Sequence, residues 1–237
     1  MQENKKVATE EYVNNSYVTA GRKADTIVGE NSTAEGKNNE ASGNCSHAEG
    51  EGTKATGNYS HAEGAQYDST KQTIAGGDYS HAEGCGTKAT KSYAHSEGIL
   101  TEATGEAAHA EGYLTKATGA RAHSEGWFAT ASGQSSHAEG EKTVASGQAS
   151  HASGYYTKAT TLGQMATGKW NETNSNALFI VGNGTKEDEK DENGNVTTKN
   201  RSNAFEVIST NDGVSIKVGN TILTEEKLIK LIAMLND

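Results

Sequence analysis

The sequence predicts an all-β fold: a parallel β-roll, or solenoid, of 14-residue coils, with short N- and C-terminal helices and a small C-terminal β-segment. The eight histidines all occupy one slot of a repeat, at successive spacings of 14, 20, 14, 14, 14, 14 and 14 residues. Inside each repeat, small and large residues alternate with the period of two that is typical of a strand. So strict a repeat requires each coil to meet its neighbours in the same way.

The composition leaves little material for a conventional core. Only thirty of the 237 residues are Leu, Ile, Val or Phe, about 13%, which is below the ~20% at which composition alone suggests disorder. The repeat favours order, because coils built on Ala, Ser, Thr and Gly can hydrogen-bond to one another. So thin a core is not expected to hold one chain folded alone. We therefore expect oligomerisation to supply the missing burial.

Several classes of protein are excluded. The net charge of −10 repels phosphates, so we expect no nucleic-acid partner. No apolar run approaches 18 residues, so we expect no membrane insertion. The N-terminus has no apolar signal core, which predicts assembly in the cytoplasm. Cys45 and Cys85 lie at different repeat positions without metal-ligand spacing and are expected to be free thiols. We expect no cofactor.

The 14-residue unit consists of two related heptads of the form x-x-[Ser/Thr]-x-Ala-x-Gly, as in residues 44–50 and 51–57. We expect Ser/Thr, Ala and Gly to face the inside of the coil and the intervening residues to face outward. Gly would close each strand because the corner needs a positive φ or a close backbone approach. The series spans residues 23–168, and six extra residues near 66–76 predict a loop that bulges from one coil.

The two strands of each coil differ in their outward slots. In the second strand these slots vary among Lys, Glu, Thr and Val, whereas the first strand repeats His and Glu. Free solvent would not demand such sameness, so we expect the first strand to face a partner and the second to face water. The predicted polar column consists of His47, Glu49, His61, Glu63, His81, Glu83, His95, Glu97, His109, Glu111, His123, Glu125, His137, Glu139 and His151.

The ends of the chain depart from the repeat. In residues 1–22, the segment Thr9–Val18 predicts a short helix with Thr9 as its N-cap. In residues 169–223, strands are expected at 176–182, 202–208 and 214–218, with an acidic hairpin loop at 186–195 that turns at Asn193-Gly194. In residues 224–237, Thr224 caps a helix from 225 to 235. Its apolar stripe suits a short coiled coil and contains Leu228, Ile232 and Leu235.

The heptad cadence resembles the head repeat of trimeric autotransporter adhesins, the YadA-like or Hep/Hag left-handed β-roll. The resemblance covers about 60% of the chain. It implies a left-handed roll and a homotrimer of parallel rolls around a three-fold axis. In that family the outward slots of the first strand usually carry aliphatic residues that face the trimer interior. By this resemblance, His and Glu line the axis here.

The ends instead resemble phage tail-fibre and tail-associated proteins. Residues 8–13 resemble their N-terminal attachment helices, and residues 176–184 with 201–207 resemble the segment that follows their repeats. The resemblance implies a structural and host-binding trimeric fibre of a phage tail or tail-derived particle, located in the virion tail. Its partners would be a tail or baseplate protein at the N-terminus and a glycan or protein of the bacterial surface. The alternative is a bacterial cell-surface adhesin head of the trimeric autotransporter type.

Three interpretations of the His/Glu column stay open. It forms a polar trimer interface in which His of one chain bonds Glu of the next, or a ladder that faces solvent. Alternatively, three histidines on the three-fold axis chelate Zn²⁺, Ni²⁺ or Fe²⁺. Catalysis needs one singular, preorganised constellation rather than eight copies, so we expect no enzyme.

Two smaller features also have alternatives. The segment from Glu189 to Gly194 faintly resembles a Ca²⁺ loop, but Asn200 stands where that loop needs Glu, so a solvated hairpin tip is expected. Aromatic residues recur near strand corners, either packed on adjacent coils or forming a strip that stacks on surface glycans. The candidate glycan contacts are Tyr59, Tyr79, Tyr93, Tyr113, Trp127, Tyr155 and Tyr156.

Overall fold

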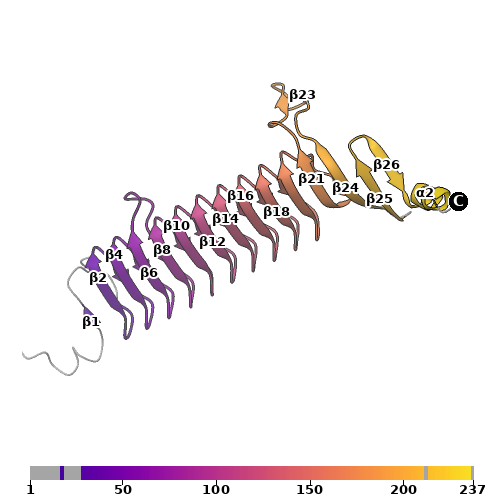
Figure 1. Ribbon diagram of the computed structural model, residues 1–237. Coiled ribbons are helices and arrows are strands. Elements are labelled where there is room, and N and C mark those ends of the chain that lie inside the picture. Colours follow the sequence, from indigo (N-terminus) through magenta and orange to yellow (C-terminus); the bar gives the residue numbers. More distant parts are fainter. Residues whose placement is uncertain (1–16, 19–27, 211–212, 236–237) are drawn as a thin grey trace, which may run out of the picture. The chain divides into compact units, whose positions relative to one another are not determined.

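The computed structural model describes residues 17–18, 28–210 and 213–235 (Figure 1). The chain divides into two compact units, Met1–Leu114 and Thr115–Asp237, and each unit is described by itself. The fold is all-β: a parallel β-solenoid of about 14-residue coils, followed by a small strand segment and a short C-terminal helix.

In the first unit, each coil contributes one long strand to one parallel sheet and one short strand to a second parallel sheet. The register is strict: each His pairs with the His of the next coil, and each Glu with the next Glu. The long strands are β2 (Thr33–Lys37), β4 (His47–Glu51), β6 (His61–Ala65), β8 (His81–Cys85), β10 (His95–Ile99) and β12 (His109–Tyr113), and the short ones are β3 (Glu40–Ala41), β5 (Lys54–Ala55), β7 (Ile74–Ala75), β9 (Lys88–Ala89) and β11 (Glu102–Ala103).

The second unit repeats this plan and then changes it. Its long strands are β14 (His123–Trp127), β16 (His137–Glu141), β18 (His151–Tyr155) and β20 (Met165–Lys169), and its short strands are β13 (Lys116–Ala117), β15 (Thr130–Ala131), β17 (Val144–Ala145) and β19 (Lys158–Ala159). β21 (Ala177–Asn183) adds to β20 in parallel. The sheet then becomes antiparallel through β24 (Asn203–Thr210), β25 (Gly213–Val218) and β26 (Thr221–Thr224).

The core of each coil is made of Ala, Ser and Thr, as the heptad pattern predicts, whereas the glycines that close the long strands, such as Gly50 and Gly64, are exposed rather than inside the coil. Ala48, Thr53 and Ala55 are fully buried and Ser46 nearly so. Some of the buried hydroxyls are satisfied locally: Ser46 Oγ donates to the carbonyl of Gly43 at 2.7 Å, whereas Thr53 Oγ1 makes no hydrogen bond. Backbone ladders between coils, rather than large apolar side chains, therefore supply most of the order.

Glycine closes the long strands for both of the predicted reasons. Gly50 has φ +103°, and a Cβ there would lie 1.9 Å from the carbonyl oxygen of Gly64. The left-handed conformation is not confined to glycine, however. One non-glycine residue at many corners has a positive φ, among them Tyr59 (57°), Leu100 (56°) and Ala149 (52°). The sequence analysis did not anticipate this, because no glycine marks these corners.

The exposed alanine at position 149 gives a test of corner strain. A left-handed residue with a Cβ costs about 1–2 kcal/mol, and glycine avoids that cost at a smaller entropic penalty. We expect Ala149→Gly to raise the free energy of unfolding by about 0.5–1 kcal/mol in urea denaturation. The matched control is Ala145→Gly, in strand β17, which should lower it. Destabilisation by Ala149→Gly would contradict the corner geometry.

The six extra residues form a loop between β6 and β7, as predicted (Figure 1). Asp68 and Lys71 form an isolated bridge, and Tyr67 N donates to Lys71 O at 2.8 Å. Asp68 Oδ1 accepts hydrogen bonds from the backbone N and the hydroxyl of Thr70, at 2.8 and 2.7 Å. The insertion thus leaves the coil register on both sides intact.

The prediction of an N-terminal helix is wrong for its last two residues. Tyr17–Val18 form strand β1, which pairs in parallel with Thr33 and Ala34 of β2. An aromatic and a β-branched residue favour extended backbone, and the edge of β2 offers unpaired backbone groups. The rest of that predicted helix, residues 9–16, lies outside the described residues.

Most of the elements predicted for the C-terminal segment are present in the structure. The three predicted strands appear as β21, β24 and β25, whereas β26 was missed. The acidic loop forms a hairpin of β22 (Glu189–Lys190) and β23 (Val196–Thr198). Helix α2 (Glu225–Leu235) starts where predicted, and Lys227 N donates to Thr224 Oγ1 at 3.4 Å. Within the part of the chain that the structure describes, no helix has the length and apolar character needed to cross a bilayer.

Candidate functional site

The outward surface of the long strands, from β4 to β12 in one unit and from β14 to β18 in the other, is called the His–Glu face. Its histidines form ladders because the strand register places each ring over the ring of the next coil. Neighbouring ring centroids lie 4.7–4.9 Å apart within each unit, with nearly parallel planes. The histidines therefore stack from coil to coil within each unit, and their side chains are half-buried in the single chain.

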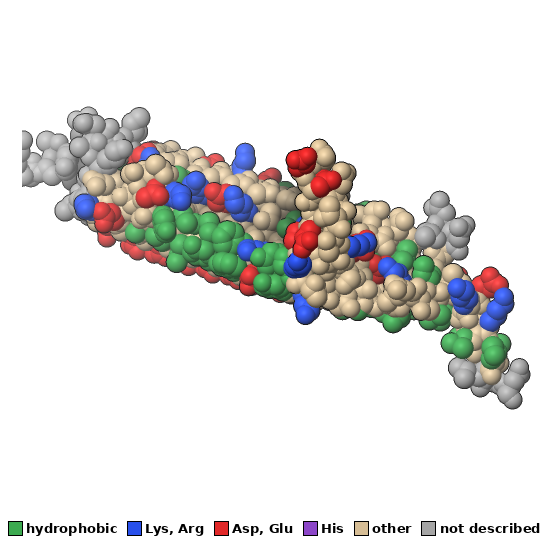
Figure 2. Space-filling model, turned by 90° about the horizontal axis from the view of Figure 1, so that it is seen from above, with side chains coloured by type: hydrophobic (Ala, Val, Ile, Leu, Met, Phe, Trp, Pro, Cys, Tyr) green, Lys and Arg blue, Asp and Glu red, His purple; other side chains and the backbone are tan. Residues whose placement is uncertain are grey.

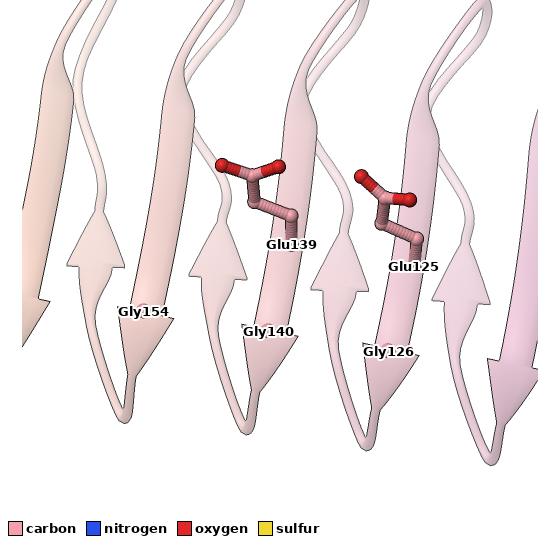
Figure 3. A pocket seen from close by; sticks show the side chains of 5 residues that line it. All are labelled: Glu125, Gly126, Glu139, Gly140 and Gly154. Carbon is pink, nitrogen blue, oxygen red and sulfur yellow. The ribbon is translucent and has the colours of Figure 1, made fainter.

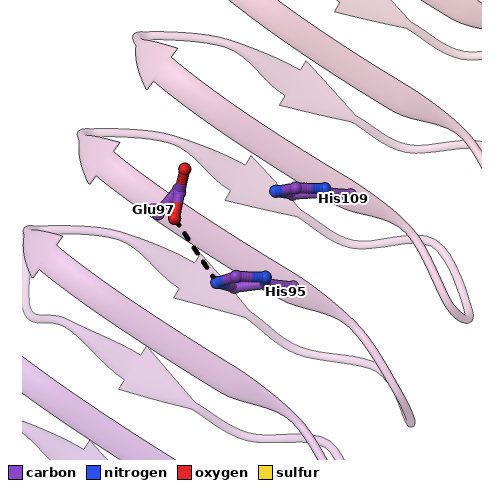
Figure 4. Close-up of side chains that lie close together, drawn as sticks. All are labelled: His95, Glu97 and His109. Carbon is purple, nitrogen blue, oxygen red and sulfur yellow. Dashed lines mark ion pairs between the residues drawn. The ribbon is translucent and has the colours of Figure 1, made fainter.

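Each imidazole lies beside a carboxylate of the same chain. In the first unit a partner belongs to the same strand: His95 Nε2 lies 3.7 Å from Glu97 Oε2 (Figure 4). His81 Nε2 also lies 3.8 Å from Glu63 Oε1 of the preceding coil. In the second unit it belongs to the preceding coil: His137 Nε2 lies 3.3 Å from Glu125 Oε1. The His–Glu contact, which was expected between chains, thus exists within one chain.

The Nε2 atoms of the first unit are shielded but weakly satisfied. Those of His47, His61, His81 and His95 are buried and make no hydrogen bond. Their distances to the nearest carboxylate oxygens, 3.7–3.9 Å, fall in ion-pair range but beyond hydrogen-bond range. These four nitrogen atoms can therefore still accept a hydrogen bond or bind an electrophile.

The carboxylates repel one another along the ladder. Two such charges about 5 Å apart cost about 1–3 kcal/mol at effective dielectric constants between those of water and a protein surface. Hydrogen bonds with the carboxylates of Glu83 and Glu49 raise the pKa of Glu63 to about 7. The pKa of Glu83 is lowered in turn, because its carboxylate accepts from Glu63.

Three of the histidines offset little of this charge at neutral pH. Burial, followed by repulsion from neighbouring histidines, lowers the pKa of His61, His81 and His123. A lowered histidine pKa contributes stability that is complete above pH 6.5 and is lost as pH falls towards the folded-state pKa. The His–Glu face is therefore negatively charged near pH 7.

Glu63 gives the opposite pH dependence. Its raised pKa means that the folded state binds the proton more tightly, so its contribution is complete below pH 4.5 and is lost as pH rises through about 7. We expect Glu63→Gln to raise the free energy of unfolding by about 1 kcal/mol at pH 8, after allowance for solvent screening, and to change nothing at pH 4. Urea denaturation at both pH values measures this. The exposed Glu106→Gln is the control, and an equal effect at pH 4 and pH 8 would refute the shared proton.

A shallow groove runs beside the carboxylates on the His–Glu face. In the second unit it is lined by Glu125, Gly126, Glu139, Gly140 and Gly154 (Figure 3). Because the glycines carry no side chains, backbone forms the floor and the carboxylates form one wall. The first unit has the same groove, lined by Glu49, Glu63 and Glu83 with their neighbouring glycines. The His–Glu face thus combines a groove with a backbone floor and a row of imidazole nitrogen and carboxylate oxygen atoms.

The candidate glycan contacts occupy two different edges of the coils rather than one strip. Tyr59, Tyr79 and Tyr93 lie at the turn before the long strands, each more than half exposed, with ring centroids 4.9 and 5.3 Å apart. The others lie where the long strands end: Tyr113, Trp127, Tyr155 and Tyr156. Figure 2 shows hydrophobic side chains gathered along an edge of the molecule, beside a row of acidic ones.

Packing explains several of these aromatics. Tyr156 stacks on Trp170 with centroids 3.8 Å apart, and Lys142 Nζ lies 4.7 Å from the centre of the Tyr156 ring. In the tyrosine stack of the first unit, the rings cover one another's faces. That stack therefore presents ring edges and hydroxyls to a ligand rather than the faces on which a sugar would stack.

The predicted coiled-coil stripe of α2 is open to solvent in the single chain. Ile229 and Ile232 are 60% and 59% exposed, and Leu228 is half-buried. Met234 is 76% exposed. The side chain of Leu235 lies outside the described residues.

The sequence analysis missed the group that holds the acidic hairpin. Arg201 is only 6% exposed, and its Nη2 donates to Glu187 Oε2 at 2.6 Å. Its Nη1 donates to the carbonyls of Tyr156 and Asn171, both at 3.0 Å, and its guanidinium lies 4.9 Å from the centre of the Trp170 ring. The arginine lies outside the repeat, so no spacing singled it out.

The Ca²⁺-like part of this hairpin is used for the turn itself. Asp191 Oδ1 accepts hydrogen bonds from the backbone N of Asn193 and of Asn195, at 2.9 and 2.8 Å. The hydrogen bond from the Asn195 side chain, followed by these backbone hydrogen bonds, lowers the pKa of Asp191. This geometry fits the expected solvated hairpin tip.

Neither the known protein-family models nor the curated proteins give a match for this chain. The repeated His–Glu face offers two kinds of chemistry, side-chain pairing with another chain and coordination by N and O donors.

Proposed function

We propose that this chain is the subunit of a homotrimeric fibre of a phage tail or tail-derived particle, which attaches the particle to a bacterial surface. The observation that carries the proposal is the contrast between the two sheets. The His–Glu face repeats the same two polar side chains coil after coil, whereas the short strands present varied side chains to solvent.

The His–Glu face suits contact with identical chains. Its side chains are half-buried in one chain, and their Nε2 atoms are already largely withdrawn from water. A second face of the same kind would bring further carboxylates within reach of these imidazoles, and each imidazole can donate with one nitrogen and accept with the other. Three parallel copies would repeat this pairing at every coil.

The α2 helix supports the same arrangement. It has only 11 residues, and isolated helices of that length are marginal in water. Its exposed Ile229 and Ile232 would be buried in a three-helix coiled coil. We propose that α2 clamps the three chains at their C-terminal ends.

Attachment would be multivalent. Weak contacts repeated over three chains and several fibres sum to firm adhesion without any single strong site. The N-terminal segment, residues 1–22, would dock to a tail or baseplate protein, and the exposed tyrosine edges supply aromatic and hydroxyl groups for a host glycan or protein. Eight equivalent His slots do not make the singular site that catalysis needs, so the proposal includes no reaction.

Immunogold electron microscopy of a culture that produces this protein tests the proposal, with antibodies against residues 186–195 and against an N-terminal tag. We expect gold on particle tails, with the two labels at opposite ends of the fibre. Gold on the cell envelope of the producing bacterium would favour the adhesin alternative, in which the chain is part of a cell-surface head. Label that stays with soluble material would contradict both.

A further inference from the structure

We propose that the His–Glu face binds divalent transition-metal ions of the Zn²⁺ class between successive coils, with two imidazoles and one carboxylate of a single chain as ligands. One such group is His95, Glu97 and His109 (Figure 4). This site goes beyond the fibre function and does not depend on it, because its ligand set is complete within one chain.

The distances suit a metal after a small movement of the rings. One ligand atom from each of the three side chains lies within 4.8 Å of the other two, and His95 Nε2 is 3.7 Å from Glu97 Oε2. Tetrahedral coordination at ordinary Zn–N and Zn–O lengths separates ligand atoms by about 3.4 Å. The two imidazoles, now parallel with centroids 4.7 Å apart, would need to tilt towards each other.

The strands fix the rest of the geometry. Backbone pairing of His95 with His109 and of Glu97 with Glu111 holds the side-chain origins in register. The half-buried side chains keep room to change their torsion angles. The Nε2 atom of His95 is buried yet makes no hydrogen bond, so a metal would take up an acceptor that is otherwise poorly used.

The donor set selects the kind of ion. Ca²⁺ and Mg²⁺ take oxygen ligands, whereas two imidazoles with one carboxylate suit Zn²⁺ and similar borderline ions. A divalent ion would also offset the repulsion along the carboxylate ladder. Protonation of the imidazoles competes with metal binding, so affinity should fall as pH drops below the histidine pKa.

The ladder limits the number of ions. Each Nε2 can ligate one ion. Two neighbouring metal sites that share a histidine therefore cannot both be occupied. The chain of eight histidines therefore binds at most one ion for every two histidines. A carboxylate surface that merely gathers counterions would have no such limit.

Isothermal titration calorimetry of the metal-free protein with ZnCl₂, at pH 7.5 and at pH 5, tests the proposal. At pH 7.5 we expect micromolar or tighter binding that saturates at or below one ion per two histidines, and at pH 5 at least tenfold weaker binding. CaCl₂ should not compete. Equal, millimolar binding of both ions, or stoichiometry above that limit, would overturn the proposal.

A double variant locates the ions. His61→Gln with His95→Gln leaves no two successive coils between His47 and His109 that both carry histidine, so the largest possible number of bound ions should fall from four to two. The matched control is Glu40→Gln with Glu102→Gln on the short strands, which should leave the number unchanged. If circular dichroism shows that the histidine variant is unfolded, Glu63→Gln with Glu97→Gln keeps every imidazole and should weaken at least tenfold the binding of the ions that use these two carboxylates, while ions beside Glu125 and Glu139 bind as before. Unchanged binding in a folded variant of either kind rules the site out.

Discussion

Replacing Gly140 with alanine is expected to lower the free energy of unfolding by about 3–5 kcal/mol, enough to unfold much of the protein. Gly140 has φ +101°, where a residue with a Cβ is strained. A Cβ at this position would also lie 2.3 Å from the carbonyl oxygen of Gly154 in the next coil. Because that obstacle is backbone, β16 and β18 would have to separate, at the cost of ladder hydrogen bonds.

Gly163 is the matched control for this substitution. It also has a positive φ, +65°, but a Cβ there would meet nothing within 4 Å. Gly163→Ala should therefore cost only about 1 kcal/mol, the price of the left-handed backbone alone. Urea denaturation followed by circular dichroism measures both. Equal losses in the two variants would mean that close packing of the coils does not govern stability here.

The double substitution Ile229→Asp with Ile232→Asp is expected to abolish assembly while leaving the fold of each chain in place. Both side chains are about 60% exposed in the single chain, so little burial within the chain is lost. In the proposed trimer they would be buried, and burying two isoleucines contributes about 3 kcal/mol or more per chain. Charged residues there would weaken association by more than a hundredfold.

Sedimentation equilibrium measures this effect as a fall from three chain masses towards one. Lys230→Gln is the control on the same helix: it removes only the exposed ion pair with Glu226, and we expect the mass to be unchanged. Circular dichroism should show the same β-sheet signal in all three proteins. A variant with both aspartates that keeps the mass of the unsubstituted protein would exclude α2 as a clamp.

The repeat made most of the fold predictable, because its spacing fixes pairing as well as secondary structure. The inward Ala55 and outward Glu49 follow directly from the period of two, and the bulge near Asp68 follows from six surplus residues. The cap of α2 at Thr224 was likewise readable from local sequence. In each case, the local sequence determines the structure, and contacts with distant segments do not change it.

The features that were not predicted depend on contacts between segments that are far apart in the sequence. Tyr17 and Val18 read as the end of a helix but join the edge of β2, whose free backbone groups the sequence does not reveal. Arg201 binds Glu187 across the acidic hairpin and packs on Trp170, contacts that no spacing encodes. The two aromatic edges were predicted as one strip, although Tyr93 precedes the histidine of its coil by two residues and Tyr113 follows that of its coil by four. The Glu63 proton is also invisible in sequence, since it depends on how closely carboxylates of successive coils approach.

Cysteine cross-linking through position 153 tests the assembly most directly. Ser153 occupies the Glu slot of its coil, on the His–Glu face, whereas Thr130 faces outward on a short strand. With Cys45 and Cys85 replaced by serine, mild oxidation of Ser153→Cys should give a disulfide-linked dimer band on a non-reducing gel, since three thiols around an axis can pair two at a time. Thr130→Cys should remain a single-chain band. Cross-linking at position 130 and none at position 153 would contradict the claim that the His–Glu face joins the chains.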